Sequence, residues 1–380
     1  MEKVQIKTGN KAYEVLIESG LFSELPQVLK EKYSGKKLAL VSDSNVFPLY
    51  GENLYSALIK IGFEVVPIVF EAGEAHKTME TLNWIYTKLA EDAFTRSDMV
   101  IALGGGVTGD MAGLAAATFL RGMGFIQIPT TLLAMVDSSI GGKVAVDLPQ
   151  GKNLVGAFYQ PDAVYADPQL LETLNDEQFA DGMAELLKHG FIRDVDLCQS
   201  LVEIMPKNAS VGLEGKASKM TRRQIHAGEL DKMIMKSCCI KRDVVQQDEN
   251  DNGIRQLLNF GHTLGHAIER VQHYTGLSHG QAVSVGMVVM TQLTEKMGLT
   301  RLGETQKLRE ALALYDLPVD IPKLDIQALV SAISIDKKAR SGKITIAYIE
   351  QLGEGKLKEL ELKELEDRIY GILMHSIHTP

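Results

Sequence analysis

The sequence predicts a two-domain protein, with an α/β domain built on a parallel sheet at residues 1–175 and a mainly α-helical domain at residues 176–380. Three observations support this fold class. The chain of 380 residues exceeds the size that one hydrophobic core usually serves. Up to about residue 175, apolar strand-like runs alternate with helical runs, which is the pattern of a parallel sheet wound right-handedly. Beyond that point the runs are helical, so we place the boundary between residues 172 and 178.

The elements of the first domain are assigned from their periodicity and from the turn residues that separate them. Residues 3–18 alternate polar and apolar side chains around a Gly-Asn-Lys turn and predict a hairpin. Thr78 stands where a helix N-cap is expected. The series continues with helix 21–33, strand 36–46, helix 53–62, strand 63–73, helix 77–93, a strand and a small-residue helix within 98–120, and a strand at 125–131.

The second domain is expected to consist mainly of helices, with a polar, solvent-exposed loop at residues 206–224. Near the end of the chain, a basic turn at residues 336–338 precedes a predicted strand at 341–350. The predicted helices lie within residues 179–192, 232–245, 257–271, 280–298 and 305–315.

The composition excludes several classes of protein. Hydrophobic residues make up 45% of the chain and charged residues 23%, which is typical of a soluble globular protein. A net charge of −9 without a basic block argues against a nucleic-acid partner. Three cysteines, two of them adjacent, are too few for a disulfide framework and indicate a reducing compartment. Because we find neither a signal peptide nor an apolar run of about 18 residues, we expect a cytosolic protein.

A glycine-rich turn follows the strand near residue 100. Gly104, Gly106 and Gly109 satisfy GxGxxG between a strand and a helix, which lets the backbone approach a pyrophosphate at the helix N-terminus. The acidic residue expected about 20 positions later is absent, because residues 125–128 form an apolar strand. Asp43, at the end of an earlier strand, is the alternative ligand for a ribose, although it could equally only cap the next helix.

Two lysines follow glycines in an otherwise apolar segment. Lys143 comes after Gly141-Gly142, and Lys152 comes after Gly151. Most lysines are simply solvated on the surface, but on such turns they are suited to binding phosphate, or to amine chemistry if desolvated. Neither matches the Walker pattern, since no Ser or Thr follows the lysine.

Histidines gather in residues 241–281. His262 and His266 are four positions apart in a helical run, so both rings project from one face, and His279 follows after a short polar linker. With Glu185 as a carboxylate, this set suits a zinc-like divalent metal. Two histidines at this spacing can also be a mere polar stripe, and the HExxH pattern is absent. Further polar groups that suggest a phosphorylated or carboxylated substrate are Lys188, Lys241, Arg255 and Asn259.

The motifs taken together resemble those of the 3-dehydroquinate synthase family. In order along residues 40–350 they are GGGVTGD, VDSSIGGK, GKNLVGAF, AELLKHG, DNGIRQLLNFGHTLGHAIE, LSHG and DKK. The resemblance implies an N-terminal α/β nucleotide-binding domain and a C-terminal helical domain that binds metal. It also implies the conversion of 3-deoxy-D-arabino-heptulosonate 7-phosphate to 3-dehydroquinate and phosphate, a step of the shikimate pathway, with NAD and zinc or cobalt as cofactors.

The resemblance also assigns roles to residues. Glu185, His262 and His279 would bind the metal. Arg121 would sit near the phosphate and could reach a neighbouring subunit in a homodimer, while Lys337 or Lys338 would add a further cation. The NAD-binding residues would be Asp43, Glu74, Lys77, Gly105, Gly106, Val107, Asp110, Thr130, Thr131, Leu133, Lys143, Lys152, Thr173 and Leu174. The substrate would contact Asp137, Lys143, Lys152, Asn153, Lys188, Lys241, Arg255, Asn259 and His266.

Two positions depart from the family pattern. Asp251 replaces the usual glutamate of DExExGLR, and Gln281 replaces the usual glutamate of HGEAV. Three rival functions stay open: another sugar-phosphate cyclase, a metal-dependent polyol dehydrogenase of related fold, and a catalytically inactive nucleotide-binding module. The lysines at positions 143, 152, 188 and 241 speak against the dehydrogenase, because a neutral alcohol gives them nothing to bind.

Overall fold

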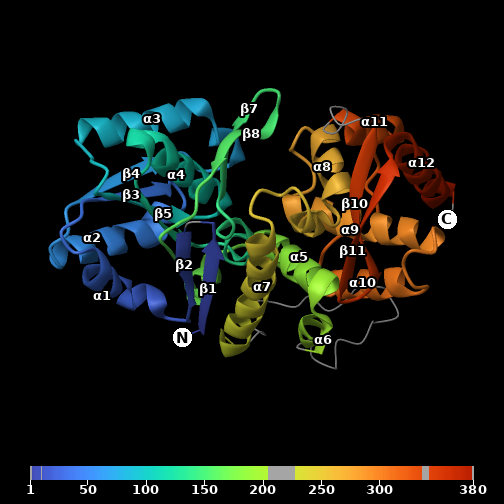
Figure 1. The fold of residues 1–380 in the computed structure, drawn as a ribbon, viewed down its shortest axis with the longest axis horizontal. Coiled ribbons are helices and arrows are strands. Elements are labelled where there is room, and N and C mark those ends of the chain that lie inside the picture. The colour runs from blue at the N-terminus through green and yellow to red at the C-terminus, as the bar shows by residue number, and fades with distance from the viewer. Residues whose placement is uncertain (1, 10, 204–226, 336–341, 379–380) are drawn as a thin grey trace. The chain divides into compact units, whose positions relative to one another are not determined.

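The computed structural model describes residues 2–9, 11–203, 227–335 and 342–378, and the chain divides into two compact units (Figure 1). Unit 1 comprises Met1–Leu174 and His226–Asn250, and unit 2 comprises Asn175–Ile225 and Asp251–Pro380. The loop expected at 206–224 and the two lysines at 337 and 338 lie outside the described residues. Within the described ranges, none of the helices combines the length and the apolar character needed to span a membrane.

Unit 1 is built on a seven-stranded sheet in which every neighbouring pair is parallel except β1 with β2. The strand order is β1-β2-β9-β6-β5-β3-β4. This confirms the predicted parallel α/β class and the predicted N-terminal hairpin. The strands are β1 (Glu2–Thr8), β2 (Lys11–Ile17), β3 (Leu38–Asp43), β4 (Val65–Phe70), β5 (Met99–Gly104), β6 (Gly124–Pro129) and β9 (Ala163–Ala166).

Helices cover both faces of this sheet, with α1 and α2 on one side and α3 and α4 on the other (Figure 1). Thr78 caps α3 as predicted, accepting a hydrogen bond from Thr81 N at 3.2 Å. The helix α4 packs closely because its buried residues are mostly small, and a Cβ at Gly113 would collide with Val144 and Phe125. The helices are α1 (Leu21–Tyr33), α2 (Glu52–Lys60), α3 (Met79–Glu91) and α4 (Gly106–Thr118).

A hairpin that the sequence analysis did not predict follows the glycines at 141 and 142. Its strands are β7 (Lys143–Leu148) and β8 (Gly151–Phe158), which pair antiparallel in a separate two-stranded sheet. Gly141 and Gly142 have positive φ values of 97° and 69°, so they do form the expected turn. Lys143 thus starts one strand of the hairpin, and Lys152 lies at the start of the other.

The helix α7 (Ala227–Gln247) groups with unit 1, whereas from the sequence we expect all residues from 176 onward in the second domain. Polar contacts explain the difference. Ser19 Oγ donates to Asp231 Oδ1 at 2.8 Å, and Lys7 N donates to Gln246 Oε1 at 2.8 Å. A helix distant in sequence thereby packs beside the N-terminal hairpin.

In its described residues, unit 2 is mainly helical, as predicted, with one antiparallel pair of strands. The helix α9 is buried along most of its length and packs against α8 and α5. A Cβ at Gly286 would collide with the backbone at Gly261, so glycine allows α8 and α9 to cross closely. The elements are α5 (Asp176–Arg193), α6 (Val195–Glu203), α8 (His262–Val271), α9 (His279–Lys296), α10 (Glu304–Ala313), α11 (Ile326–Ile335), β10 (Lys343–Gln351), β11 (Glu354–Glu361) and α12 (Leu362–His378).

Candidate active site

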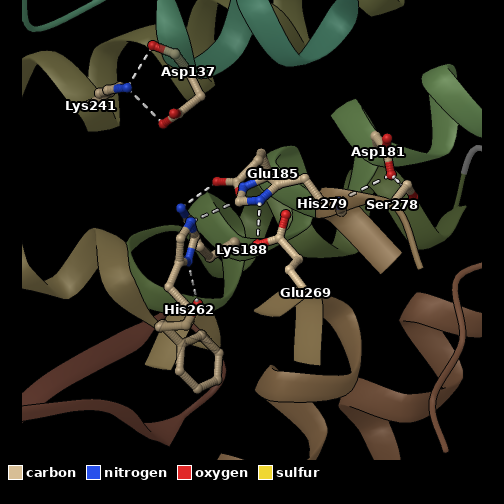
Figure 2. A network of polar contacts seen from close by, with 11 residues as sticks. Asp137, Asp181, Glu185, Lys188, Lys241, His262, Glu269, Ser278 and His279 are labelled. Atoms are coloured by element: carbon tan, nitrogen blue, oxygen red, sulfur yellow. Dashed lines mark hydrogen bonds and ion pairs between the residues drawn. The ribbon is translucent and has the colours of Figure 1, made fainter. Parts of the chain in front are cut away.

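Three side chains from three helices of unit 2 meet at one point (Figure 2). Glu185 projects from the middle of α5, His262 from the first position of α8, and His279 from the first position of α9. Oε1 of Glu185 lies 3.5 Å from Nε2 of His262 and 3.8 Å from Nε2 of His279. Ligand atoms of the three side chains lie within 4.8 Å of one another, so a single metal ion could contact all three.

The N-terminal ends of α8 and α9 determine where His262 and His279 lie. Gly261 adopts φ 81° as the N-cap of α8, which turns the chain sharply just before His262. Ser278 caps α9 in a capping box with Gln281, so the glutamine that departs from the family pattern still closes the helix start. The position of α9 relative to α5 is fixed by Asp181, whose Oδ1 accepts from Ser278 Oγ at 2.5 Å and from Gly280 N at 3.1 Å.

The site is built for a cation. Glu185 is fully buried, and neither of its carboxylate oxygens receives a hydrogen bond among the described residues, although Lys188 forms an ion pair with Oε2. A buried carboxylate is stable only if positive charge compensates it. Two imidazole nitrogens and one carboxylate oxygen are also the donor set that zinc-like metals prefer. The residues therefore fit a divalent metal.

Burial and charge act differently on the two histidines. Burial, assisted by Lys188 and by the neighbouring imidazoles, holds the pKa of His262 well below its usual value, so this ring is neutral and offers a lone pair. Burial also lowers the pKa of His279, but contact with the carboxylates of Glu269 and Glu185 outweighs it and raises the pKa overall. Metal binding at His279 must therefore displace a proton more often than at His262.

His266 lies beside this triad without belonging to it. Its exposed ring is centred 5.3 Å from the ring of His262 and 6.0 Å from that of His279. Arg255, which is buried, and Asn259, which is exposed, lie on the short helix η7 (Ile254–Asn259) just before α8. Asp251 precedes this segment in a left-handed backbone conformation with φ 59°.

A second polar network lies in unit 1 and is organised around Lys77. This lysine is 4% exposed and donates from Nζ to Asp110 Oδ2 at 2.5 Å and to Asn153 Oδ1 at 2.5 Å. The neighbouring Lys152 forms an ion pair with Glu74 at 3.4 Å. Burial raises the pKa of Asp110 to about 6, against the opposing effect of the Lys77 ammonium. Residues expected to bind NAD and residues expected to bind substrate are thus joined in one network.

The glycine-rich turn joins β5 to α4, with Gly105 as the helix N-cap. Asp43 caps the next turn, because its Oδ1 accepts from the backbone N of Asn45 and of Val46 at 2.9 Å each. Its Oδ2 accepts from Thr108 Oγ1 at 3.1 Å, on the first turn of α4. Asp43 therefore closes the turn after β3 but does not cap the next helix, because neither η1 (Phe47–Gly51) nor α2 has a side-chain hydrogen bond at its N-cap.

The other expected residues of unit 1 are spread over several of its elements. Asp137, on the short helix η4 (Ala134–Ser138), is held by Lys241 of α7, whose buried Nζ lies 2.7 Å from Oδ1. Thr173 shares a 2.8 Å hydrogen bond with the hydroxyl of Tyr50 near the end of unit 1, where Leu174 follows. Val107 lies on the first turn of α4, whereas Thr130, Thr131 and Leu133 follow the end of β6, and Lys143 and Arg121 are exposed.

The residues that support both networks were not predicted from the sequence. Asp147 accepts from the backbone N of Asn153 at 2.7 Å, and Asp181, Ser278 and Glu269 surround the histidine cluster. Only Ser278 carried a signal, since Ser-x-x-Gln before an apolar run predicts a capping box.

Comparison with known proteins gives matches along nearly the whole chain. Residues 67–181 match the family model described as 3-dehydroquinate synthase N-terminal, and residues 182–339 match the one described as 3-dehydroquinate synthase C-terminal. A 3-dehydroquinate synthase of Clostridium kluyveri is 43% identical over 373 residues, covering 98% of each chain. One of Streptococcus mutans is 40% identical over 365 residues, covering 96% of this chain and 99% of the relative.

Solved structures share the fold. The 2-epi-5-epi-valiolone synthase of Streptomyces hygroscopicus, solved with NAD+ and Zn2+ bound, superposes with a TM-score of 0.83 at 26% identity, covering 97% of this chain and 99% of the other. A probable glycerol dehydrogenase from Sinorhizobium meliloti gives a TM-score of 0.64 at 15% identity, covering 98% of this chain and 99% of the other. The second likeness shows the fold alone.

Proposed function

The chain belongs to the 3-dehydroquinate synthase family, and from this premise we propose that it converts 3-deoxy-D-arabino-heptulosonate 7-phosphate to 3-dehydroquinate and phosphate. The observation that carries the proposal is the triad of the buried Glu185 and the half-buried His262 and His279. It lies within a chain that matches both family models and is about 40% identical to synthases over almost its full length. The enzyme would be a lyase, because phosphate leaves by elimination, with cleavage of a carbon–oxygen bond.

Two cofactors belong to the proposal. Glu185, His262 and His279 would hold a divalent metal, zinc or cobalt, and the residues around the glycine turn and Asp43 would hold NAD. When bound, NAD would take up and return one hydride, and the metal would polarise the reacting hydroxyl and ketone as a Lewis acid. Because the hydride is returned, the overall reaction neither consumes nor produces NADH.

The protein's own residues would prepare the phosphate to leave. A phosphate dianion needs cations and hydrogen-bond donors, which Lys152, Asn153, His266 and Arg121 would supply. The leaving phosphate can itself accept the neighbouring proton, so no dedicated protein base is required. We assign Asp137 and Lys188 to positioning hydroxyls and water rather than to binding metal.

Further contacts to the substrate are assigned to the buried cations and the polar groups beside them. Lys188, Lys241 and Arg255 are all buried, and the ion pairs of Lys188 with Glu185 and of Lys241 with Asp137 hold those two ammonium groups in place, which supports this assignment. Lys143 and Asn259 complete the set. The proposed assembly is a homodimer in the cytosol, and light scattering after size exclusion tests the dimer.

Product identification tests the proposal. The purified chain is incubated with the heptulosonate phosphate, NAD and zinc, and the products are resolved by mass spectrometry. We expect 3-dehydroquinate to appear only when both cofactors are present. Unchanged substrate, together with oxidation of glycerol by NAD, would instead support the polyol dehydrogenase, and turnover of a different sugar phosphate would support another cyclase.

A further inference from the structure

His279 lies between two carboxylates, one at each of its ring nitrogens (Figure 2). Its Nε2 faces Oε1 of Glu185 at 3.8 Å, whereas its Nδ1 faces Oε2 of Glu269 at 3.5 Å. Glu269 lies on α8 and is 4% exposed, so its carboxylate is withdrawn from water. A buried carboxylate at this place needs a donor, and the imidazole N–H provides one.

His262 repeats the same arrangement with a different acceptor. Its Nδ1 lies 3.3 Å from the carbonyl oxygen of Phe260, while its Nε2 faces Glu185 at 3.5 Å. In a neutral imidazole, a proton on Nδ1 leaves the lone pair on Nε2. Both rings therefore present Nε2 to the same point, each held by an acceptor behind it.

We propose that Glu269 is a positioning residue that fixes the orientation and the tautomer of His279 for metal binding. The proposal rests on the metal site of the proposed function and goes beyond it, because it adds a residue outside the ligand triad. A carboxylate behind a ligating histidine makes the ring a stronger donor than a carbonyl does. The helix α8 thereby supplies one ligand, His262, and the support for another ligand on α9.

The ring geometry argues against Glu269 as a fourth ligand of the same ion. Nδ1 and Nε2 of one imidazole point away from each other, so an ion bound at Nε2 lies on the far side of the ring from Glu269. Glu269 also forms a group with His266 and His279 that could itself contact an ion. The experiment must therefore separate support of the ligand from direct ligation.

Cobalt(II) titration of the metal-free protein makes this separation, because cobalt absorbance reports the ligand set as well as the affinity. We expect Glu269→Ala to weaken cobalt binding by about 10- to 100-fold, and Glu269→Gln to weaken it less, because the amide keeps an acceptor but loses the charge. At saturation both variants should give the absorption bands of the unaltered protein. Urea unfolding of each variant shows whether it is folded.

Glu304→Gln is the matched control. Glu304 is another buried glutamate of unit 2, 5% exposed, but it binds Lys307 and the backbone N of Leu352 rather than a histidine. This change should lower stability and leave cobalt affinity unaltered. A control that weakened cobalt binding as much as Glu269→Ala would overturn the proposal, since loss of any buried carboxylate would then suffice.

The remaining outcomes separate the inference from the proposed function. If the unaltered protein binds no cobalt, the metal site itself is wrong, and the positioning role is wrong with it. If the unaltered protein binds cobalt and the Glu269 variants bind it equally well, only the positioning role is overturned. Altered absorption bands at saturation would make Glu269 a direct ligand and would also overturn it.

Discussion

Replacing Lys188 with methionine should destabilise the metal-free protein strongly and the metal-loaded protein much less. Lys188 is 1% exposed and forms an ion pair with the equally buried Glu185, three positions earlier on α5. Removing one partner of a buried pair leaves an uncompensated charge and costs about 3–5 kcal/mol. Without metal, Lys188→Met should therefore lose roughly that much of its free energy of unfolding.

A bound divalent ion changes this cost, because it also compensates the carboxylate of Glu185. If the ion restores about half of the lost stability, the destabilisation caused by Lys188→Met differs by about 2 kcal/mol between the metal-free and the metal-bound protein. Thermodynamic linkage requires the same difference in metal affinity, so Lys188→Met should bind zinc about 30-fold more tightly. Turnover should nevertheless fall, since Lys188 is assigned to the substrate.

The assay is urea unfolding with chelator and with excess zinc, combined with competition titration of zinc. Lys307→Met is the matched control, because Lys307 pairs with the buried Glu304 at the same i,i+3 spacing but its own side chain is 61% exposed. Such a partly exposed pair is worth about 1 kcal/mol or less, and its loss should not depend on metal. Equal destabilisation of Lys188→Met with and without zinc, or weaker zinc binding, would refute the reasoning.

The other predictions concern the histidines and Asp110. His262→Ala and His279→Ala should each abolish turnover and stoichiometric metal binding, the latter measured by elemental analysis. Retained metal in either variant would contradict the proposed ligand triad. His266→Ala should lower turnover while bound metal stays near one ion per subunit. Loss of metal would contradict the assignment of His266 to the phosphate rather than to the metal. Because burial raises the pKa of Asp110 from 3.8 to about 6, the folded chain holds a proton there that the unfolded chain has released. This raised pKa makes its largest contribution to the free energy of unfolding below pH 3.8, and the contribution is lost as the pH rises through about 6. Urea unfolding across this window should show that Asp110→Asn lacks the decline, and parallel pH profiles would contradict the raised pKa.

Much of the architecture could be predicted because it depends on local pattern. The parallel strands are apolar runs with turn residues on both sides, and Thr78 caps its helix as its position indicates. The spacing of His262 and His266 placed both rings on one helix face. The strand β11 was missed because its sequence, EGKLKELE, carries charges suited equally to an exposed helix.

The pairings within the sites could not be predicted, because they join residues far apart in the chain. Lys77 meets Asn153 across 76 positions, and Lys241 meets Asp137 across 104. The sequence offers no period or motif for such contacts. Glu269 resembled an ordinary helix glutamate, and its role behind His279 depends on how α8 packs against α9.

The most direct test of the proposed chemistry follows phosphate and NADH together. The unaltered protein is given the heptulosonate phosphate, NAD and zinc or cobalt, and phosphate release and absorbance at the NADH band are recorded on the same sample. A cycle in which the hydride is returned predicts continuous phosphate release without net NADH. Accumulation of NADH in step with substrate consumption, or no phosphate release from protein with both cofactors bound, would contradict it.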